Sequence, residues 1–279
     1  MPFHRFEQLE QKNLTPDLSS ARGPVIEGDY MYFCMVHKAA GTGSEPHYHP
    51  NELLIFPVRG AINAVVGRDA RVVRPGTFVH APAYARHSMK ATVDGDLSYL
   101  YIKDKTWTVV GLAADAAVPG QAYTVDEINT LVGGGGRRQA AEGQSQAVVD
   151  GLKECYYPLI GALDAPQVSA RRVYWIEGGR LAFGLFDVPA GYAEPEMVSN
   201  REMFLYVIGG RMHARTGEET REVGPGDVVQ VPRGMPYQFD VTSAFARYAM
   251  VCSTPWLEAK IDHMTPAERE QSRIHNRAN

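Results

Sequence analysis

The chain of 279 residues has little cysteine and no large excess of charge of either sign. Its three cysteines, Cys34, Cys155 and Cys252, lie far apart and form no Cys-x-x-Cys pair. This spacing argues against both a disulfide framework and a zinc–thiolate site. A formal net charge of −4 and a pI near 6.1 provide no basic footprint for nucleic acid or for anionic lipid. We therefore expect reduced thiols and no nucleic-acid partner.

Long apolar runs are absent as well. No stretch of the sequence approaches the roughly 18 consecutive apolar residues of a membrane-spanning helix. The first residues, MPFHRFEQ, lack the apolar core of a secretory signal. We expect no membrane partner and a cytoplasmic location. Hydrophobic residues still make up 44% of the chain, which is enough for sizeable cores.

The sequence contains an internal repeat with an offset of 150 residues. The matching pairs, mostly turn residues, are Gly41 with Gly191, Glu52 with Glu202, Gly60 with Gly210, Gly76 with Gly226, and Pro82 with Pro232. Agreement of turn residues at a constant offset indicates a duplicated domain.

Each copy reads as short strands separated by glycine and proline turns. In the first copy the apolar runs cover residues 30–36, 53–58, 61–66, 71–74, 77–80 and 97–102, and the pattern returns over 180–252. Such spacing predicts an all-β protein made of small antiparallel sandwiches or barrels. We expect a short helix at 125–131, where Thr124 is a plausible N-cap, and a charged helix near the C-terminus.

The expected organisation has five parts. They are an N-terminal arm (1–24), a first barrel (25–105), a linker with the short helix (106–170), a second barrel (171–255) and a C-terminal helical tail (256–279).

Histidines concentrate in the first copy, where His47 and His49 are followed by Glu52 and, further on, by His87. On a strand, residues i and i+2 point to the same face with Cα atoms roughly 6.6–6.8 Å apart. Two such imidazoles can converge on one ion, and the further histidine and glutamate could complete the site. The cluster predicts a metal site.

The turn residues around these histidines carry a family resemblance. Gly41, His47, His49, Glu52 and Gly60 resemble the first cupin motif, with altered spacing around the glutamate. The second cupin motif is matched by Gly76, Pro82 and His87, with Tyr84 in place of its last glycine and Ala91 in place of its asparagine.

The chain thus resembles the cupin superfamily and, through its duplication, a bicupin. The resemblance implies two tandem double-stranded β-helix (jelly-roll) barrels and one divalent transition metal per chain. The implied metal ligands are His47, His49, Glu52 and His87.

The second copy has lost the three histidines. Its counterpart of the His-x-His stretch, Pro-Glu-Met-Val-Ser at 195–199, contains no histidine, and Tyr237 stands at the last ligand position. We expect one metal site, in the first barrel only. Glu202 nevertheless persists without histidines, so Glu52 is either a ligand or a structural or catalytic group.

Candidate pocket residues follow from strand parity. If Glu52 faces inward, so do Leu54 and Phe56 on the same strand. On the neighbouring strand the pocket would be lined by Phe33 and Met35, or alternatively by Tyr32 and Cys34. Tyr84 would cap the mouth, and Tyr84 and Glu52 are the candidate catalytic residues. His37 and His80 are expected to be non-catalytic.

These features predict an oxygenase that cleaves a small aromatic or dicarbonyl substrate at Fe(II). Mn, Ni, Zn, Co and Cu also suit the ligands. The alternatives are a non-redox isomerase, lyase or hydrolase using Mn, Zn or Ni, and a non-catalytic binding protein. A homodimer is expected from cupin habit and from the need to cover sheet edges.

Overall fold

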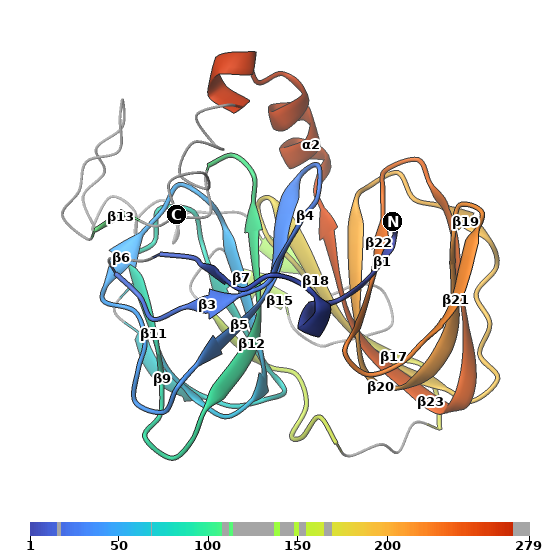
Figure 1. The fold of residues 1–279 in the computed structure, drawn as a ribbon, viewed down its shortest axis with the longest axis horizontal. Coiled ribbons are helices and arrows are strands. Elements are labelled where there is room, and N and C mark those ends of the chain that lie inside the picture. Colours follow the sequence, from blue (N-terminus) through green and yellow to red (C-terminus); the bar gives the residue numbers. More distant parts are fainter. Residues whose placement is uncertain are drawn as a thin grey trace.

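The protein forms two β-barrels side by side, with a C-terminal helix above them (Figure 1). This computed structural model describes residues 1–15, 18–67, 69–107, 112–113, 137–139, 148–150, 155–164 and 169–269. The all-β expectation, with two barrels and a C-terminal helix, is confirmed. The helix expected at 125–131 lies outside the described residues.

The first barrel is built from two sheets. The larger sheet contains β2 (Lys12–Asn13), β3 (Arg22–Gly23), β4 (Val25–Glu27), β5 (Met31–Lys38), β7 (Leu53–Arg59), β10 (Thr77–Ala81), β12 (Leu97–Asp104) and β16 (Tyr156–Pro158). The smaller sheet contains β6 (His47–Tyr48), β8 (Ile62–Val66), β9 (Asp69–Val73), β11 (His87–Ala91) and β13 (Leu112–Ala113). A separate hairpin pairs β14 (Arg137–Gln139) with β15 (Val148–Asp150).

The second barrel is one continuous sheet. Its two longest strands, β20 and β23, pair along most of their length, with shifts of register that let each strand run from one side of the barrel to the other. Its strands are β1 (Phe3–Arg5), β17 (Arg172–Glu177), β18 (Leu181–Pro189), β19 (Met197–Val198), β20 (Met203–Thr216), β21 (Glu219–Val223), β22 (Asp227–Val231) and β23 (Pro236–Ser253). Gly60 and Gly210 both have φ near +75° (76° and 75°), which explains why both copies keep glycine there.

Several segments expected to be peripheral belong to the barrels. β1 pairs with β22 of the second barrel, with Phe3 opposite Val229, and a short 3-10 helix, η1 (Phe6–Gln8), follows it. The rest of the expected N-terminal arm supplies β2 and β3 to the first barrel, and β16 of the expected linker pairs with β10. The helix α2 (Pro255–Asp262) is capped by the Thr254 side chain.

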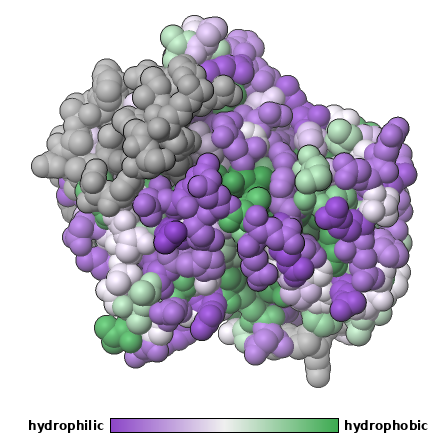
Figure 2. Space-filling view, viewed as in Figure 1, coloured by the Kyte–Doolittle hydropathy of each residue, from purple (hydrophilic) through white to green (hydrophobic). Residues whose placement is uncertain are grey.

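Three apolar cores hold the molecule together. One fills the interior of each barrel, and the third joins the barrels to each other and to α2. In that joint core Phe33 stacks on Phe204 with ring centroids 5.0 Å apart, and Phe78 stacks on Phe183 at 4.4 Å. Figure 2 shows a largely hydrophilic surface with apolar residues visible along the seam between the barrels.

Among the described residues, no helix combines the length and hydrophobicity needed to cross a lipid bilayer.

Candidate metal centre

Three histidines meet inside the first barrel. His47 on β6 lies directly opposite His87 on β11, so strand pairing itself brings the two imidazoles together. Their ring centroids are 4.4 Å apart, and the His49 ring lies 4.7 Å from that of His87. All three side chains are buried, with at most 5% of their surface exposed.

Backbone carbonyls set the tautomer of each ring. The Nδ1 atoms of His47, His49 and His87 lie 2.7, 3.0 and 2.8 Å from carbonyl oxygens that are two residues away in the sequence. A carbonyl only accepts hydrogen bonds, so each Nδ1 carries the proton and each Nε2 keeps its lone pair. This is the arrangement in which a histidine binds a metal through Nε2.

The site fits a metal ion. One nitrogen from each histidine lies within 4.8 Å of the others, and this is the metal-binding group found among the described residues. The Nε2 atoms of His49 and His87 are buried without a hydrogen-bond partner in the described part of the chain. Burying polar atoms without a partner is unfavourable, and a shared cation would satisfy them.

Burial also keeps the three rings neutral. It lowers the pKa of His47 to about 4 and holds the pKa values of His49 and His87 well below the ordinary histidine range. The Lys103 ammonium lowers all three further. Neutral imidazole is the form of histidine that coordinates metals, so at neutral pH the three rings are in the form that a metal ion requires.

Lys103 is a further buried polar group on the interior side of the first barrel. It lies on β12, two residues after Tyr101, and its Nζ is 5.3 Å from the centroid of the Tyr101 ring. Burial lowers the pKa of Lys103 to about 7. Our sequence reasoning did not identify this residue, although a lysine in phase with Tyr99 and Tyr101 on an apolar strand marks it as inward-facing.

Glu52 does not belong to the histidine group, and its expected role as a ligand is corrected. Its carboxylate faces the second barrel and accepts hydrogen bonds from the backbone N–H groups of Gly179, Arg180 and Leu181 at 2.7–2.8 Å. His80 lies 2.6 Å away through Nε2. These four contacts occupy the carboxylate with structural bonds, which also explains why the repeat keeps Glu202.

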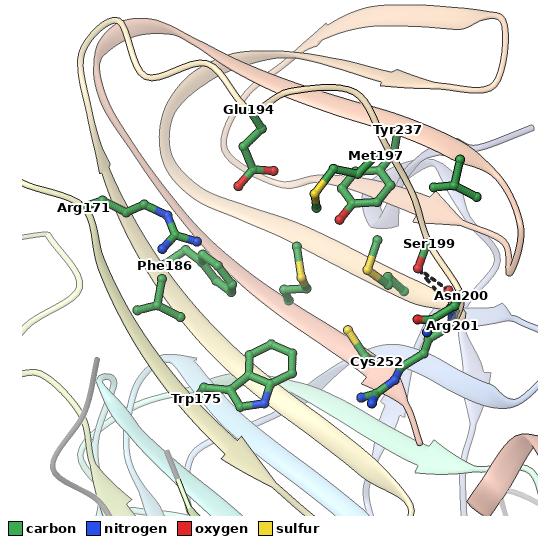
Figure 3. Close-up of a pocket in the computed structure, with 14 residues that line it drawn as sticks. Arg171, Trp175, Phe186, Glu194, Met197, Ser199, Asn200, Arg201, Tyr237 and Cys252 are labelled. Carbon is green, nitrogen blue, oxygen red and sulfur yellow. Dashed lines mark hydrogen bonds between the residues drawn. The ribbon is translucent and has the colours of Figure 1, made fainter. Parts of the chain in front are cut away.

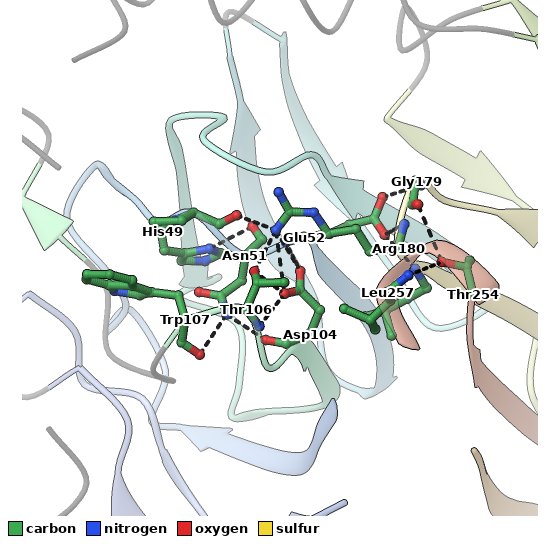
Figure 4. A network of polar contacts seen from close by, with 12 residues as sticks. His49, Asn51, Glu52, Asp104, Thr106, Trp107, Gly179, Arg180, Thr254 and Leu257 are labelled. Atoms are coloured by element: carbon green, nitrogen blue, oxygen red, sulfur yellow. Dashed lines mark hydrogen bonds and ion pairs between the residues drawn. The ribbon is translucent and has the colours of Figure 1, made fainter. Parts of the chain in front are cut away.

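A polar network connects this contact to His49 of the histidine group (Figure 4). The Arg180 guanidinium donates to the Pro50 carbonyl at 2.6 Å and lies 3.2 Å from the Asp104 carboxylate. Asp104 in turn accepts from the Glu52 backbone N–H at 2.6 Å. The His49 ring donates to the Asn51 carbonyl in the same segment. The second barrel therefore helps to fix the loop that presents His49.

The expected substrate-pocket residues face the wrong way for that role. Phe33, Met35, Leu54 and Phe56 all belong to the core between the barrels. The interior of the first barrel is lined instead by the alternate residues of the same two strands, which include Tyr32, Cys34, Leu53 and Ile55. The expectation was wrong because it depended on Glu52 facing inward. The alternative choice of Tyr32 and Cys34 agrees with the structure.

Tyr84 lies in the turn between β10 and β11 and packs against the interior core of the first barrel. Its backbone N–H donates to the His49 carbonyl at 2.8 Å, which ties this turn to the ligand segment. Its φ is +66°, the one positive value among the described non-glycine residues. That conformation explains why the matching motif position is normally glycine. A catalytic role for Tyr84 stays a prediction.

Of the other histidines, His80 is bound to Glu52 as described, and His37 is exposed with its Nδ1 2.9 Å from the Ser98 hydroxyl. Neither lies in the histidine group, and their non-catalytic role stays a prediction.

Comparison with protein families matches the model described as "Cupin domain" twice, over residues 34–103 and 184–252. An uncharacterized protein of Streptomyces coelicolor, SCO3923, is 31% identical over 75 residues, which cover 27% of this chain and 71% of that protein.

Solved structures share the two-barrel fold at low sequence identity. AerE from Microcystis aeruginosa has a TM-score of 0.60 at 11% identity, over 91% of this chain and 100% of that one. A single-substitution variant of oxalate decarboxylase from Bacillus subtilis has a TM-score of 0.61 at 15% identity, over 99% and 84% of the two chains. Ylba from E. coli has a TM-score of 0.59 at 12% identity, over 90% of each chain.

Proposed function

Because the chain belongs to the cupin superfamily and carries two cupin domains, we propose that it is a metal-dependent enzyme with its active site in the first barrel. The observation that carries this proposal is the convergence of three buried imidazoles whose Nδ1 protons are all held by backbone carbonyls. His47, His49 and His87 would bind one divalent transition metal. Fe(II) is favoured, with Mn, Ni, Zn, Co or Cu as further candidates.

The ligand set suits an oxygenated substrate. Three neutral ligands leave up to three positions of an octahedral ion open, which is enough for a substrate that chelates through two oxygens. When bound, a redox-active ion would allow dioxygen, the oxidant, to accept electrons from the substrate during oxidative cleavage, whereas a redox-inert ion would only polarise the substrate. We propose an enol, a dicarbonyl compound or a small aromatic compound as the substrate, and oxidative cleavage as the leading reaction.

The chain's own residues would bind and shield this substrate. The Lys103 ammonium lies on the interior side of the barrel and offers a cation to a substrate oxyanion. Tyr99 and Tyr101, on the same strand as Lys103, are buried in the interior core of the first barrel. Apolar neighbours such as Ile55 and Val79 exclude water, which strengthens each charge interaction inside.

A second candidate is non-redox chemistry such as isomerisation or decarboxylation, and Lys103 favours it. A buried amine whose charge acts on the three histidines, with its pKa lowered to about 7, can hold or release a proton at Nζ during a proton transfer. The fold similarity to oxalate decarboxylase, whose Mn(II) centres are named in one of the solved structures, is consistent with this candidate.

One experiment separates the two candidates. The protein is purified without oxygen, its metal content is measured, and dioxygen uptake is followed with a panel of catechols and diketones. Near-stoichiometric iron with substrate-dependent uptake supports oxidative cleavage. Manganese, zinc or nickel without uptake supports the non-redox reaction, and a protein that binds no metal refutes both.

A matched pair of lysine variants tests the role of Lys103. Lys103→Met should lower turnover by at least about ten-fold while metal content is retained, because a charged contact to the substrate is lost. Lys105→Met is the control, since the Lys105 ammonium is held by the Glu27 carboxylate and the Gly28 carbonyl. Equal turnover in both variants would remove Lys103 from the mechanism.

A further inference from the structure

The second barrel has a pocket where the first barrel has its histidines. Met197 on β19 lies opposite Tyr237 on β23, as His47 lies opposite His87 in the first barrel. With the offset of 150 residues, Met197, Ser199 and Tyr237 replace the three histidines. All three line a pocket of about 490 Å³ (Figure 3).

The interior lysine has also been replaced. Cys252 lies opposite Met203, as Lys103 lies opposite Leu53 in the first barrel, and Cys252 lines the pocket. None of the described residues at this place is an imidazole. The second barrel therefore has neither the three histidines nor the buried cation of the first barrel, and a pocket lies at their place.

The pocket walls are aromatic and sulfur-rich. Trp175 and Phe186 meet edge to face on one side with ring centroids 6.3 Å apart, and Met203 and Met250 line the interior. Thioethers and ring edges make favourable contacts with a flat aromatic ligand. A volume of this size is within the range of small-molecule sites.

Two arginines border these apolar walls. Arg171 lies over the Phe186 and Tyr192 rings, each 5.7 Å away, and its charge acts on the buried Glu194. The Arg201 guanidinium has no carboxylate partner among the described residues, and Figure 3 shows it beside Cys252. A cation without a partner at the edge of an apolar pocket suits a ligand with one negative group.

We propose that the second barrel binds a small aromatic monocarboxylate without a metal. The ring of the ligand would lie among Trp175, Phe186 and the methionines, and its carboxylate would pair with Arg201. This proposal does not depend on the reaction in the first barrel, because the two sites share no residue.

The test uses the whole protein and isothermal titration calorimetry with benzoate, and with benzamide as its neutral counterpart. Benzoate should bind at least about ten-fold more tightly than benzamide, since a charged hydrogen bond is worth that much or more. Arg201→Gln should remove this preference. Met197→Trp should abolish binding of both compounds by closing the mouth, and it should fold because 43% of Met197 is exposed.

His87→Ala is the control for the first barrel and should leave benzoate binding unchanged. Four results would overturn the proposal: no benzoate binding at millimolar concentration, equal affinity for benzamide, full binding in Met197→Trp, or loss of binding in His87→Ala. The melting temperature of each variant confirms that a loss of binding is not a loss of fold.

Discussion

Glu52 and Glu202 occupy the same place in the two barrels, and each binds backbone N–H groups of the other barrel. Glu52 accepts from the turn at 179–181, and Glu202 accepts from Asp29 at 2.6 Å and from Tyr30 at 2.9 Å. The contact is thus made twice, once in each direction. Gly28 and Gly178, again related by the offset of 150, give the carboxylates room to approach.

Glu52→Gln should weaken the joint between the barrels while the metal is retained. An amide cannot accept from three N–H groups and His80 as the carboxylate does, so we expect a loss of about 2–4 kcal/mol in the free energy of unfolding. Urea denaturation and metal analysis of the same sample measure both effects. Loss of the metal at unchanged stability would return Glu52 to the ligand set. Glu202→Gln is the matched variant and should destabilise without altering metal content.

Gly178→Ala should also destabilise the joint. An added Cβ would lie 2.5 Å from the Leu181 carbonyl oxygen and 2.6 Å from Glu52 Oε1, so the Glu52 carboxylate would be displaced. We expect a loss of at least about 2 kcal/mol in unfolding free energy. Gly95→Ala is the control, because a Cβ there would meet nothing within 4 Å. Equal denaturation midpoints for the two variants would contradict the close packing inferred at Gly178.

His87→Ala should abolish tight metal binding, because it removes one of three ligands. Tyr237→Ala, at the equivalent position of the second barrel, should leave metal content unchanged. Elemental analysis after gel filtration distinguishes the two. If Tyr237→Ala empties the protein of metal, the assignment of the site to the first barrel is wrong.

Lys38 should make stability depend on pH in the alkaline range. It is buried, its Nζ donates to the Met89 carbonyl at 2.6 Å, and burial lowers the pKa of Lys38 from 10.5 to about 7. Between these values the unfolded chain binds a proton that the folded chain does not, so stability rises with pH across this window.

The matched comparison is Lys38→Met. The unfolding free energy of the unsubstituted chain relative to this variant should rise by about 3 kcal/mol from pH 7 to pH 9.5, because the penalty for burying the charged amine disappears. Urea denaturation at several pH values measures the difference. A difference that stays constant with pH would contradict the lowered pKa of Lys38 in the folded barrel.

The sequence was sufficient to predict the two barrels and the three histidines, because turn glycines and an i, i+2 histidine pair have strict geometric requirements. Gly60 and Gly210 adopt the same left-handed conformation at an offset of 150 residues. The His-x-His pair and His87 meet as their spacing suggested.

Which face of these strands points into the first barrel could not be predicted, because strands such as β7 are buried on both faces. Every residue of β7 from Leu53 to Pro57 is buried, with one face toward the interior of its own barrel and the other toward the second barrel. Alternation of apolar and polar residues, which normally identifies the inner face, is missing in such a strand. The choice then depended on Glu52, whose partners lie about 130 residues further along the chain.

The pairing of β1 with β22 has a consequence for the order in which the protein can form. Residues 3–5 are synthesised before their partner strand, which follows them by more than 200 residues at 227–231. The first barrel likewise completes its larger sheet only when β16 emerges. The second barrel therefore combines a strand that precedes the first barrel with strands that follow it, and residues 3–5 cannot pair with β22 until more than 200 further residues have been translated.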